Sequence, residues 1–238
     1  MRRRVGTPGM VGIGMVSAVS GPAAAGGAAV MGGVVGGWWL VPGKTCVAAY
    51  QPKGAASYAA SKINLANPGT YNATEGVAPA WAAGTGWTFN GITQYLDSQY
   101  VPNTGNHSAS VQFNNVASDG RSLFGVLIDL NARFGAYPSR AGSGHYYDNG
   151  GGNAAVAGLI AAGNLTVAAQ NGYLNGAFDQ ALAAWTGVNI GTCIIGARRR
   201  AAGVIDNYIA VNITAFSLYS AALTAGEVLA LSTRMAAL

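Results

Sequence analysis

Short runs of β-favouring residues, broken by Gly, Asn and Pro, make up most of the chain from about residue 40 onward. In residues 209–213 apolar and polar side chains alternate, as expected of a strand that lays one face on a core. Many such runs at short intervals predict an all-β fold. The predicted strands are residues 46–50, 86–90, 94–101, 108–113, 122–130, 165–170, 192–197 and 209–219.

Two Asn-Gly pairs give the clearest turn prediction. Asn171-Gly172 and Asn175-Gly176 lie on either side of two apolar residues. Both central residues of a type I′ turn need positive φ, which Asn and Gly tolerate. The chain is therefore expected to fold back here at least once. The Gly- and Ala-rich residues 150–163 are compatible with a helix or with a loop.

One helix is predicted, close to the C-terminus. Thr224 and Glu227 have the spacing of a capping box. The apolar residues that follow, Val228, Leu229, Leu231 and Met235, recur at helical spacing. We expect Thr224 to be the N-cap, and Val228, Leu229 and Met235 to cover an end of the β structure.

The N-terminal segment has a different character. Residues 5–43 contain no charged residue and consist mainly of Gly, Ala and Val, and Arg2, Arg3 and Arg4 precede them. A basic triplet before an apolar run is typical of a secretory signal peptide or a membrane helix, and a flexible linker is a further alternative. The glycines of residues 26–37 and Pro22 disfavour a membrane helix. We expect residues 1–39 to form an extended arm that packs on neighbouring subunits, and residues 40–238 to form the domain.

The composition points to a surface with few charges. Half of the residues are hydrophobic and 9% are charged, against about a quarter in an average globular domain. Such a surface suits an assembly in which other subunits cover it. The net charge of +5 comes largely from two arginine triplets, residues 2–4 and 198–200, each interpreted as a solvated or interface patch. Basic residues are not spread along a face with aromatic residues between them, so no nucleic-acid partner is expected.

Cys46 and Cys193 are the only cysteines, both on predicted strands. They either form one disulfide or are two separate buried thiols. Neither has a His or a cationic neighbour in the sequence that would lower its thiol pKa, so no catalytic role is expected.

Several segments carry a family resemblance. Residues 173–176 read YLNG and residues 193–197 read CIIGA. In residues 213–228 a predicted strand turns into a helix through the pattern YxxxLTxxE, made by Tyr219, Leu223, Thr224 and Glu227. Together they resemble the closing half of a concanavalin A-like, laminin-G-type jelly roll. Residues 48–57, 64–69, 86–91 and 95–97 resemble the opening of such domains in phage and prophage structural proteins. The resemblance spans about residues 45–236.

The resemblance implies a two-sheet antiparallel jelly-roll sandwich, to which the sequence adds a short C-terminal helix and the extended Gly/Ala-rich arm. Members of the family often bind glycans, proteins or calcium at one rim, and some branches have a glycosidase cleft. Calcium is the one ligand ion that the resemblance makes plausible. Its candidate ligands, which otherwise serve as turn residues, are Asp206, Asn207, Asp148 and Asn149. The candidates for stacking on a sugar are Trp81, Tyr146 and Tyr147, whereas Trp87 and Trp185 are expected in the core.

The chemistry of an enzyme is not apparent in the sequence. Glycoside hydrolysis requires a pair of carboxylates, whereas the chain has two Glu residues, Glu75 and Glu227, and the cap uses the second. His107 and His145 are expected to be structural. No zinc, phosphate-loop or nucleophile motif is present in the sequence.

The sequence therefore favours a non-enzymatic virion structural protein of a bacteriophage. Such a protein would be a capsid decoration, cement or tail-fibre subunit that forms homo-oligomers within the extracellular particle. The alternatives are a glycan-binding adhesin that attaches to a host surface and a membrane-anchored display domain, although a membrane partner is not favoured.

Overall fold

The computed structural model describes residues 37–103, 105–117, 120–140, 144–150 and 152–238. Residues 1–36, which make up nearly all of the predicted arm, lie outside the described residues. Within the described part, no helix has the length and apolar character needed to cross a membrane.

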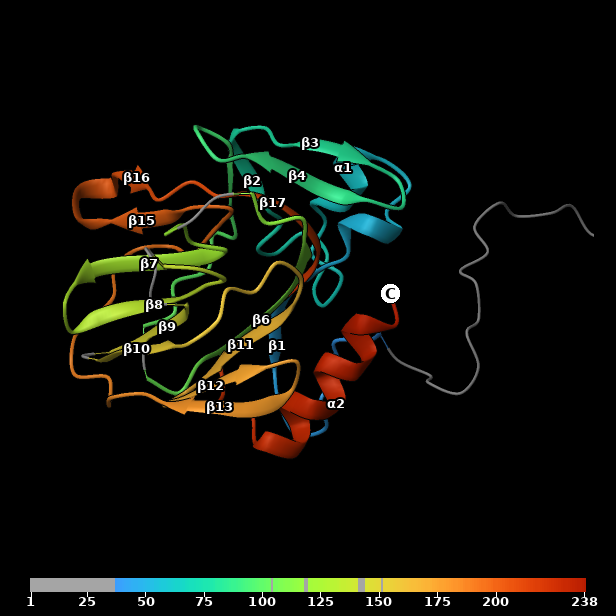
Figure 1. Ribbon diagram of the computed structural model, residues 1–238. Coiled ribbons are helices and arrows are strands. Elements are labelled where there is room, and N and C mark those ends of the chain that lie inside the picture. The colour runs from blue at the N-terminus through green and yellow to red at the C-terminus, as the bar shows by residue number, and fades with distance from the viewer. Residues whose placement is uncertain (1–36, 104, 118–119, 141–143, 151) are drawn as a thin grey trace, which may run out of the picture. The chain divides into compact units, whose positions relative to one another are not determined.

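The domain is a sandwich of two sheets, as the sequence predicted (Figure 1). The described strands form one sheet of eight and one of nine, and the strand pairs are antiparallel except for β15 with β7. The first sheet has the order β13 (Ala177–Ala181), β12 (Asn171–Leu174), β11 (Gly163–Ala168), β6 (Ser108–Asn114), β17 (Ala210–Tyr219), β4 (Gly86–Asn90) and β3 (Ala80–Ala82), and β1 (Cys46–Tyr50) also pairs with β17.

The second sheet has the order β10 (Gly152–Val156), β9 (His145–Asn149), β8 (Ala132–Tyr137), β7 (Phe124–Asp129), β14 (Ile194–Ile195), β5 (Tyr95–Asp97) and β2 (Thr74–Val77), and the short strands β15 (Arg198–Arg200) and β16 (Ile205–Asp206) extend it beside β7. Short helical segments connect strands: η1 (Pro52–Gly54), α1 (Tyr58–Ser61) and η2 (Ala201–Gly203).

The long strand β17 organises the first sheet. One side of it pairs with β6 along most of its length. The other side pairs with β4 through Ala210–Ile213 and with β1 through Phe216–Tyr219. Two strands from the first half of the chain therefore lie end to end against a single strand near the C-terminus.

Alternate side chains of both sheets meet in one core. The largest of them are fully buried, and each contributes roughly 1.5–3 kcal/mol relative to an exposed side chain. They include Trp87, Phe113, Phe124, Phe134, Phe216, Leu96 and Leu165. Tyr50 stacks on Phe216 with a ring-centroid distance of 6.3 Å, and Phe216 meets Phe124 of the other sheet edge-on at 5.4 Å.

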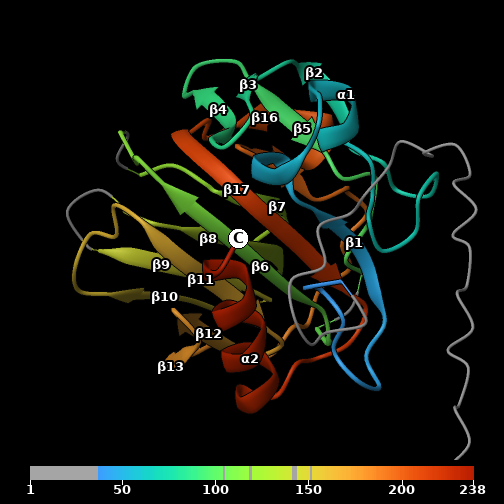
Figure 2. The ribbon, with the colours of Figure 1, turned by 90° about the vertical axis from the view of Figure 1, so that its right-hand side faces the viewer.

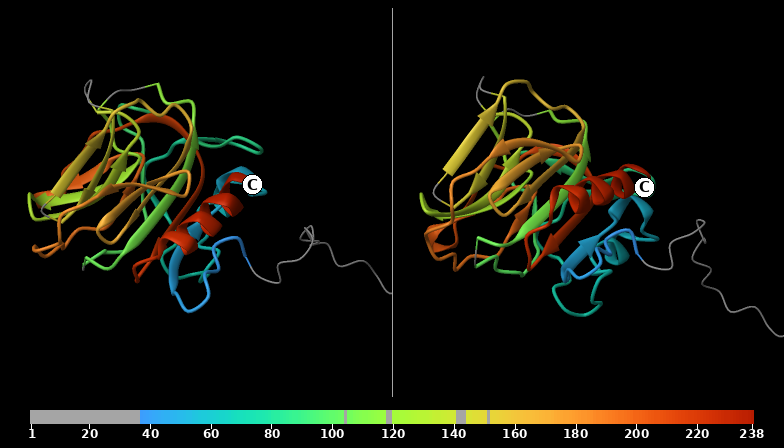
Figure 3. Two further views of the ribbon diagram at one scale, coloured as in Figure 1. Left: turned by 60° about the horizontal axis from the view of Figure 1, so that its bottom comes forward. Right: turned by 90° about the horizontal axis from the view of Figure 1, so that it is seen from below.

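Helix α2 (Ala225–Ala236) creates a second core on the outer face of the eight-stranded sheet (Figures 2 and 3). The predicted capping box is present: the Thr224 amide donates to Glu227 Oε2 at 2.7 Å, and the Glu227 amide donates to Thr224 Oγ1 at 3.3 Å. Val228, Leu231 and Met235 are buried in this second core.

The expected role of Leu229 was wrong, because its side chain is 53% exposed. Successive helix residues are about 100° apart, so Leu229 turns away from the face that Val228 and Leu231 bury. The helix also covers a face of the sandwich and not one of its ends.

Gly37, Trp38 and Trp39, which were assigned to the arm, belong to the described fold. Trp38 is buried in the second core, and the Trp39 carbonyl accepts a 2.7 Å hydrogen bond from the Tyr219 hydroxyl. Further along the chain, the Lys44 amine donates to the Ala222 carbonyl at 2.8 Å and so links this segment to the loop after β17.

The turn predictions were partly right. Asn175 and Gly176 have φ of 50° and 84° and connect β12 to β13, as the Asn-Gly pattern predicted. Asn171 and Gly172 are instead the first residues of β12, and the preceding turn has its positive φ at Ala169. Residues 150–163, expected as helix or loop, contain β10, which pairs with β9.

Candidate functional site

A pocket of about 320 Å³ opens where β5, β7 and β15 come together with the loop that precedes β14. Its lining joins segments that are far apart in the sequence. The lining residues are Asp97, Ile128, Ile190, Gly191, Thr192, Arg199, Arg200, Ala202 and Gly203.

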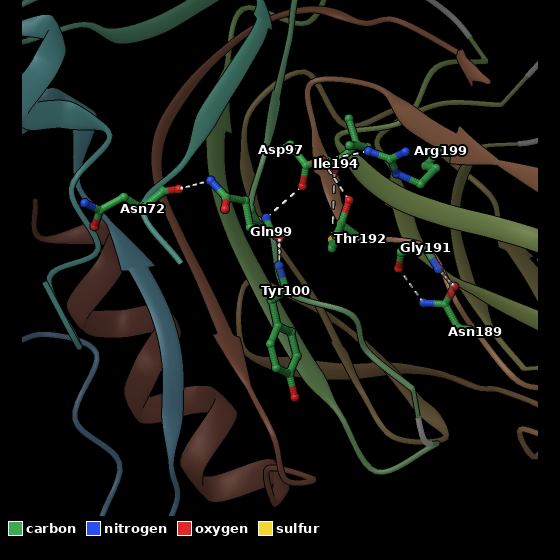
Figure 4. A network of polar contacts seen from close by, with 11 residues as sticks. Asn72, Asp97, Gln99, Tyr100, Asn189, Gly191, Thr192, Ile194 and Arg199 are labelled. Atoms are coloured by element: carbon green, nitrogen blue, oxygen red, sulfur yellow. Dashed lines mark hydrogen bonds and ion pairs between the residues drawn. The ribbon is translucent and has the colours of Figure 1, made fainter. Parts of the chain in front are cut away.

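Asp97, the last residue of β5, is the centre of the polar contacts in this pocket (Figure 4). Its Oδ2 accepts hydrogen bonds from Thr192 Oγ1 at 2.8 Å and from Arg199 Nη2 at 2.6 Å. Its Oδ1 accepts the backbone amide of Gln99 at 2.7 Å. Both carboxylate oxygens are therefore engaged, and the carboxylate holds the guanidinium and the hydroxyl in place.

The loop over the pocket is fixed by a buried amide. Asn189 Nδ2 donates to the carbonyls of Pro102 and Gly191 at 2.9 and 3.0 Å, and its Oδ1 accepts the Gly191 amide at 2.8 Å. A Cβ on Gly191 would lie 2.8 Å from Arg199 Cδ and 3.0 Å from Val126. Glycine therefore lets the loop approach the arginine closely.

Arg199 keeps a donor free of any described partner. Its Nη2 binds Asp97, whereas its Nε is buried and has no hydrogen-bond partner among the described residues. A buried N–H of this kind costs free energy unless something accepts from it. The pocket is thus lined by an arginine whose Nε lacks a hydrogen-bond partner among the described residues.

The neighbouring arginines have other contacts. Arg198 binds both oxygens of Asp206, with Nε to Oδ1 and Nη2 to Oδ2 each at 2.9 Å. Burial opposes the charge of Arg198, but its hydrogen bonds to Asp206 and Tyr137 outweigh burial and raise the pKa of the guanidinium. Arg200 lines the pocket with a side chain that is 54% exposed.

An apolar edge borders these polar groups. Ile128 and Ile190 line the pocket, and the Ile190 side chain is 78% exposed. A site that combines hydroxyl, carboxylate and guanidinium groups with aliphatic carbon matches the two faces of a sugar, which has both hydroxyl groups and C–H surfaces.

The predicted sugar-stacking residues do not lie in this pocket. Trp81 is on β3, and its indole N–H donates to the Pro52 carbonyl at 2.8 Å. Tyr146 and Tyr147 are buried on β9, which belongs to the nine-stranded sheet. Arg140 covers the Tyr146 ring at 4.0 Å, and the Tyr147 hydroxyl donates to Asp179 at 2.9 Å. The structure does not bring the three together.

The predicted calcium ligands contact other protein groups. Asp206 binds Arg198 as described, and Asp148 is buried on β9 with an oxygen 3.7 Å from Arg133. Asn149 Nδ2 donates to the Ala169 carbonyl, and Asn207 is a turn residue with φ of 52°. A carboxylate that already pairs with an arginine is a poor ligand for a cation, so these four residues do not fit calcium. Among the described residues no group of three or more His, Cys, Asp or Glu could hold a metal ion.

The histidines and cysteines lie in structural settings. His107 Nε2 is 2.6 Å from the Tyr100 hydroxyl, and His145 joins β9 to β13 through Asp179 Oδ2 at 2.5 Å. Cys46 and Cys193 are free thiols, so the disulfide alternative is wrong.

The pocket was not predicted from the sequence. Asp97 was placed on the predicted strand 94–101 and in a segment of the resemblance, and Arg199 and Arg200 were placed in a solvated or interface patch. The arginine triplet was the available signal, because three adjacent guanidinium groups on a short strand need carboxylate partners, which here come from Asp97 and Asp206.

Solved structures with sugar-related functions resemble this chain, whereas no protein-family model and no curated protein matches it. Domain 4 of AbnA, a GH43 extracellular arabinanase from Geobacillus stearothermophilus, in complex with arabinotriose, has a TM-score of 0.51 at 13% identity, covering 79% of this chain and 98% of that domain. Trypanosoma rangeli sialidase in complex with 2,3-difluorosialic acid has a TM-score of 0.55 at 15% identity, covering 81% of this chain and 35% of the sialidase chain. The chain thus spans about a third of the sialidase, and at these identities both matches establish the fold alone.

These comparisons overturn the expected virion structural role. The matching structures named above are a glycoside hydrolase domain and a sialidase, which fit the alternative of a glycan-binding domain better. Two of the segments that resembled phage proteins take part in the sandwich and its loops. Residues 86–90 are β4, and the buried Asn64 holds its loop to β1 by accepting the Ala49 amide at 2.9 Å.

Proposed function

We propose that this chain is a glycan-binding domain that holds a saccharide in the Asp97 pocket and does not cleave it. The observation that carries the proposal is the pocket itself, in which Asp97 fixes Thr192 and Arg199 beside the aliphatic Ile128 and Ile190. The Arg199 side chain lines the pocket and is 22% exposed, so its guanidinium can donate to a sugar hydroxyl, and Thr192 Oγ1 retains acceptor capacity.

The comparison with the arabinanase domain supports this proposal. That domain has the same fold over nearly its whole length and is described in complex with arabinotriose. Shared fold alone does not transfer a function, so the site has to carry the argument.

The carboxylates of the pocket support a binding role over hydrolysis. Hydrolysis by the usual mechanisms needs two carboxyl groups about 5–9.5 Å apart, one of them free to donate a proton. Asp97 is the single carboxylate in the described lining, and both of its oxygens accept hydrogen bonds from the protein.

A glycan array followed by calorimetry tests the proposal. The full chain should bind at least one saccharide, and Arg199→Ala should weaken that binding at least tenfold. Arg199→Lys, which keeps the charge but loses the planar guanidinium fork, should bind with intermediate affinity. Arg121→Ala is the matched control, because Arg121 is exposed and lies outside the pocket lining.

Two results would contradict the proposal. Binding that is unchanged in Arg199→Ala, with the fold intact by circular dichroism, would place the site elsewhere. Release of new reducing ends from the bound saccharide would show that the domain is an enzyme.

A further inference from the structure

The charges around the pocket do not balance, and this imbalance indicates what kind of saccharide it takes. Arg199 Nη2 lies 2.6 Å from Asp97 Oδ2, so these two charges compensate each other. Arg198 binds both oxygens of Asp206 at 2.9 Å, so the second pair is also matched.

Arg200 is the remaining charge. Its Nη1 is 3.6 Å from Asp206 Oδ2, an oxygen that already accepts a 2.9 Å hydrogen bond from Arg198. A contact of 3.6 Å is too long for a hydrogen bond. The three arginines thus share two carboxylates, which leaves one net positive charge beside the pocket, and solvent reaches the Arg200 side chain.

Resting on the glycan-binding function proposed above, we propose that the pocket takes an acidic saccharide, a sugar that carries a carboxylate. The planar guanidinium of Arg200 offers paired donors that match the two oxygens of a carboxylate. The hydroxyls of the same sugar meet the Arg199 guanidinium and Thr192, and its C–H face lies on Ile190. A neutral sugar would leave the net positive charge of the three arginines unbalanced.

Matched pairs of ligands test this inference on the full chain. The probes are trigalacturonate and a β-1,4-linked glucuronate trisaccharide, each compared with its methyl ester by calorimetry at about 50 mM salt. The ester keeps the shape of the sugar and removes its charge. At least one acid should bind about tenfold more tightly than its ester, the range expected for a hydrogen bond between charged groups. The preference should shrink in 0.5 M salt because exposed charges are screened.

Arg200→Gln should abolish the preference for the acid over its ester, whereas Arg121→Gln should leave this preference unchanged. Equal binding of acid and ester would overturn the inference. The inference would also be wrong if neither acid binds while the glycan array finds a neutral saccharide whose binding Arg199→Ala weakens. In that case the proposed function would still stand. If no probe and no array saccharide binds, both proposals are wrong.

Discussion

Asp148 is a carboxyl group that the fold places where ionisation is unfavourable. It is buried on β9, and burial raises its pKa above the ordinary value, while the charges of Arg133, Arg140 and Arg198 and a hydrogen bond to Tyr137 offset this only in part. Because the folded protein holds this proton more tightly than the unfolded chain, the group favours folding at low pH. Its contribution is lost as pH rises from about 4 through the folded pKa.

Asp148→Asn should therefore gain in stability relative to the natural protein as pH rises. Asparagine imitates the protonated carboxyl, so the two proteins should be similar at pH 4, and the variant should be the more stable at pH 7. Urea unfolding at both pH values measures the difference. A difference in unfolding free energy that is the same at pH 4 and pH 7 would show that Asp148 ionises normally in the fold.

The two thiols should be unreactive in the folded protein. Burial raises the pKa of Cys46 to about 12 and raises that of Cys193 as well. The thiolate is the reactive form, so alkylation at pH 7.5 should be at least tenfold slower in the native protein than in urea. Mass spectrometry over time measures both rates. Fast modification of Cys193 in the native state would mean that the strand β14 opens readily.

Among the elements, helix α2 offers a comparison of three substitutions. Thr224→Ala removes the cap and should cost about 1 kcal/mol. Leu231→Ala should cost roughly 2–5 kcal/mol because Leu231 is fully buried in the second core, whereas Leu229→Ala should cost under about 0.5 kcal/mol at its exposed position. Urea titration ranks the three. A larger loss for Leu229→Ala than for Leu231→Ala would mean that the helix packs on its other face.

The predictability of each element followed from how its sequence is patterned. β1 and β4 were predicted with their observed bounds, because β-favouring runs there end at Gly, Pro or Asn. β8 and β9 were missed, because every residue of both strands is buried and no apolar–polar alternation marks them. The sandwich was thus predictable, whereas the position of these strands within it was not.

The pocket could not be predicted in the same way. Asp97, Ile128, Thr192 and Arg199 meet only because β5, β7 and β15 lie in one sheet, and no local pattern encodes these pairings. Arg198 and Arg200 likewise share Asp206 only because β15 pairs with β16.

For the molecule as a whole, the position of Trp38 determines where the folded domain begins. Trp38 is 8% exposed in the second core, so a protein that begins at Leu40 loses a buried tryptophan that one beginning at Gly37 keeps. The shorter protein should be less stable by about 3 kcal/mol. Thermal unfolding of the two truncated forms gives the comparison, and equal midpoints would show that Trp38 contributes nothing.

The central place of β17 has a consequence for synthesis. As the chain leaves the ribosome, β1, β4 and β6 emerge long before residues 210–219, the strand against which all three pair. Until that strand appears, their hydrogen-bonding edges and apolar faces stay open to other chains. Folding therefore depends on the last tenth or so of the chain, and a ribosome that stalls before that strand releases a product prone to aggregate.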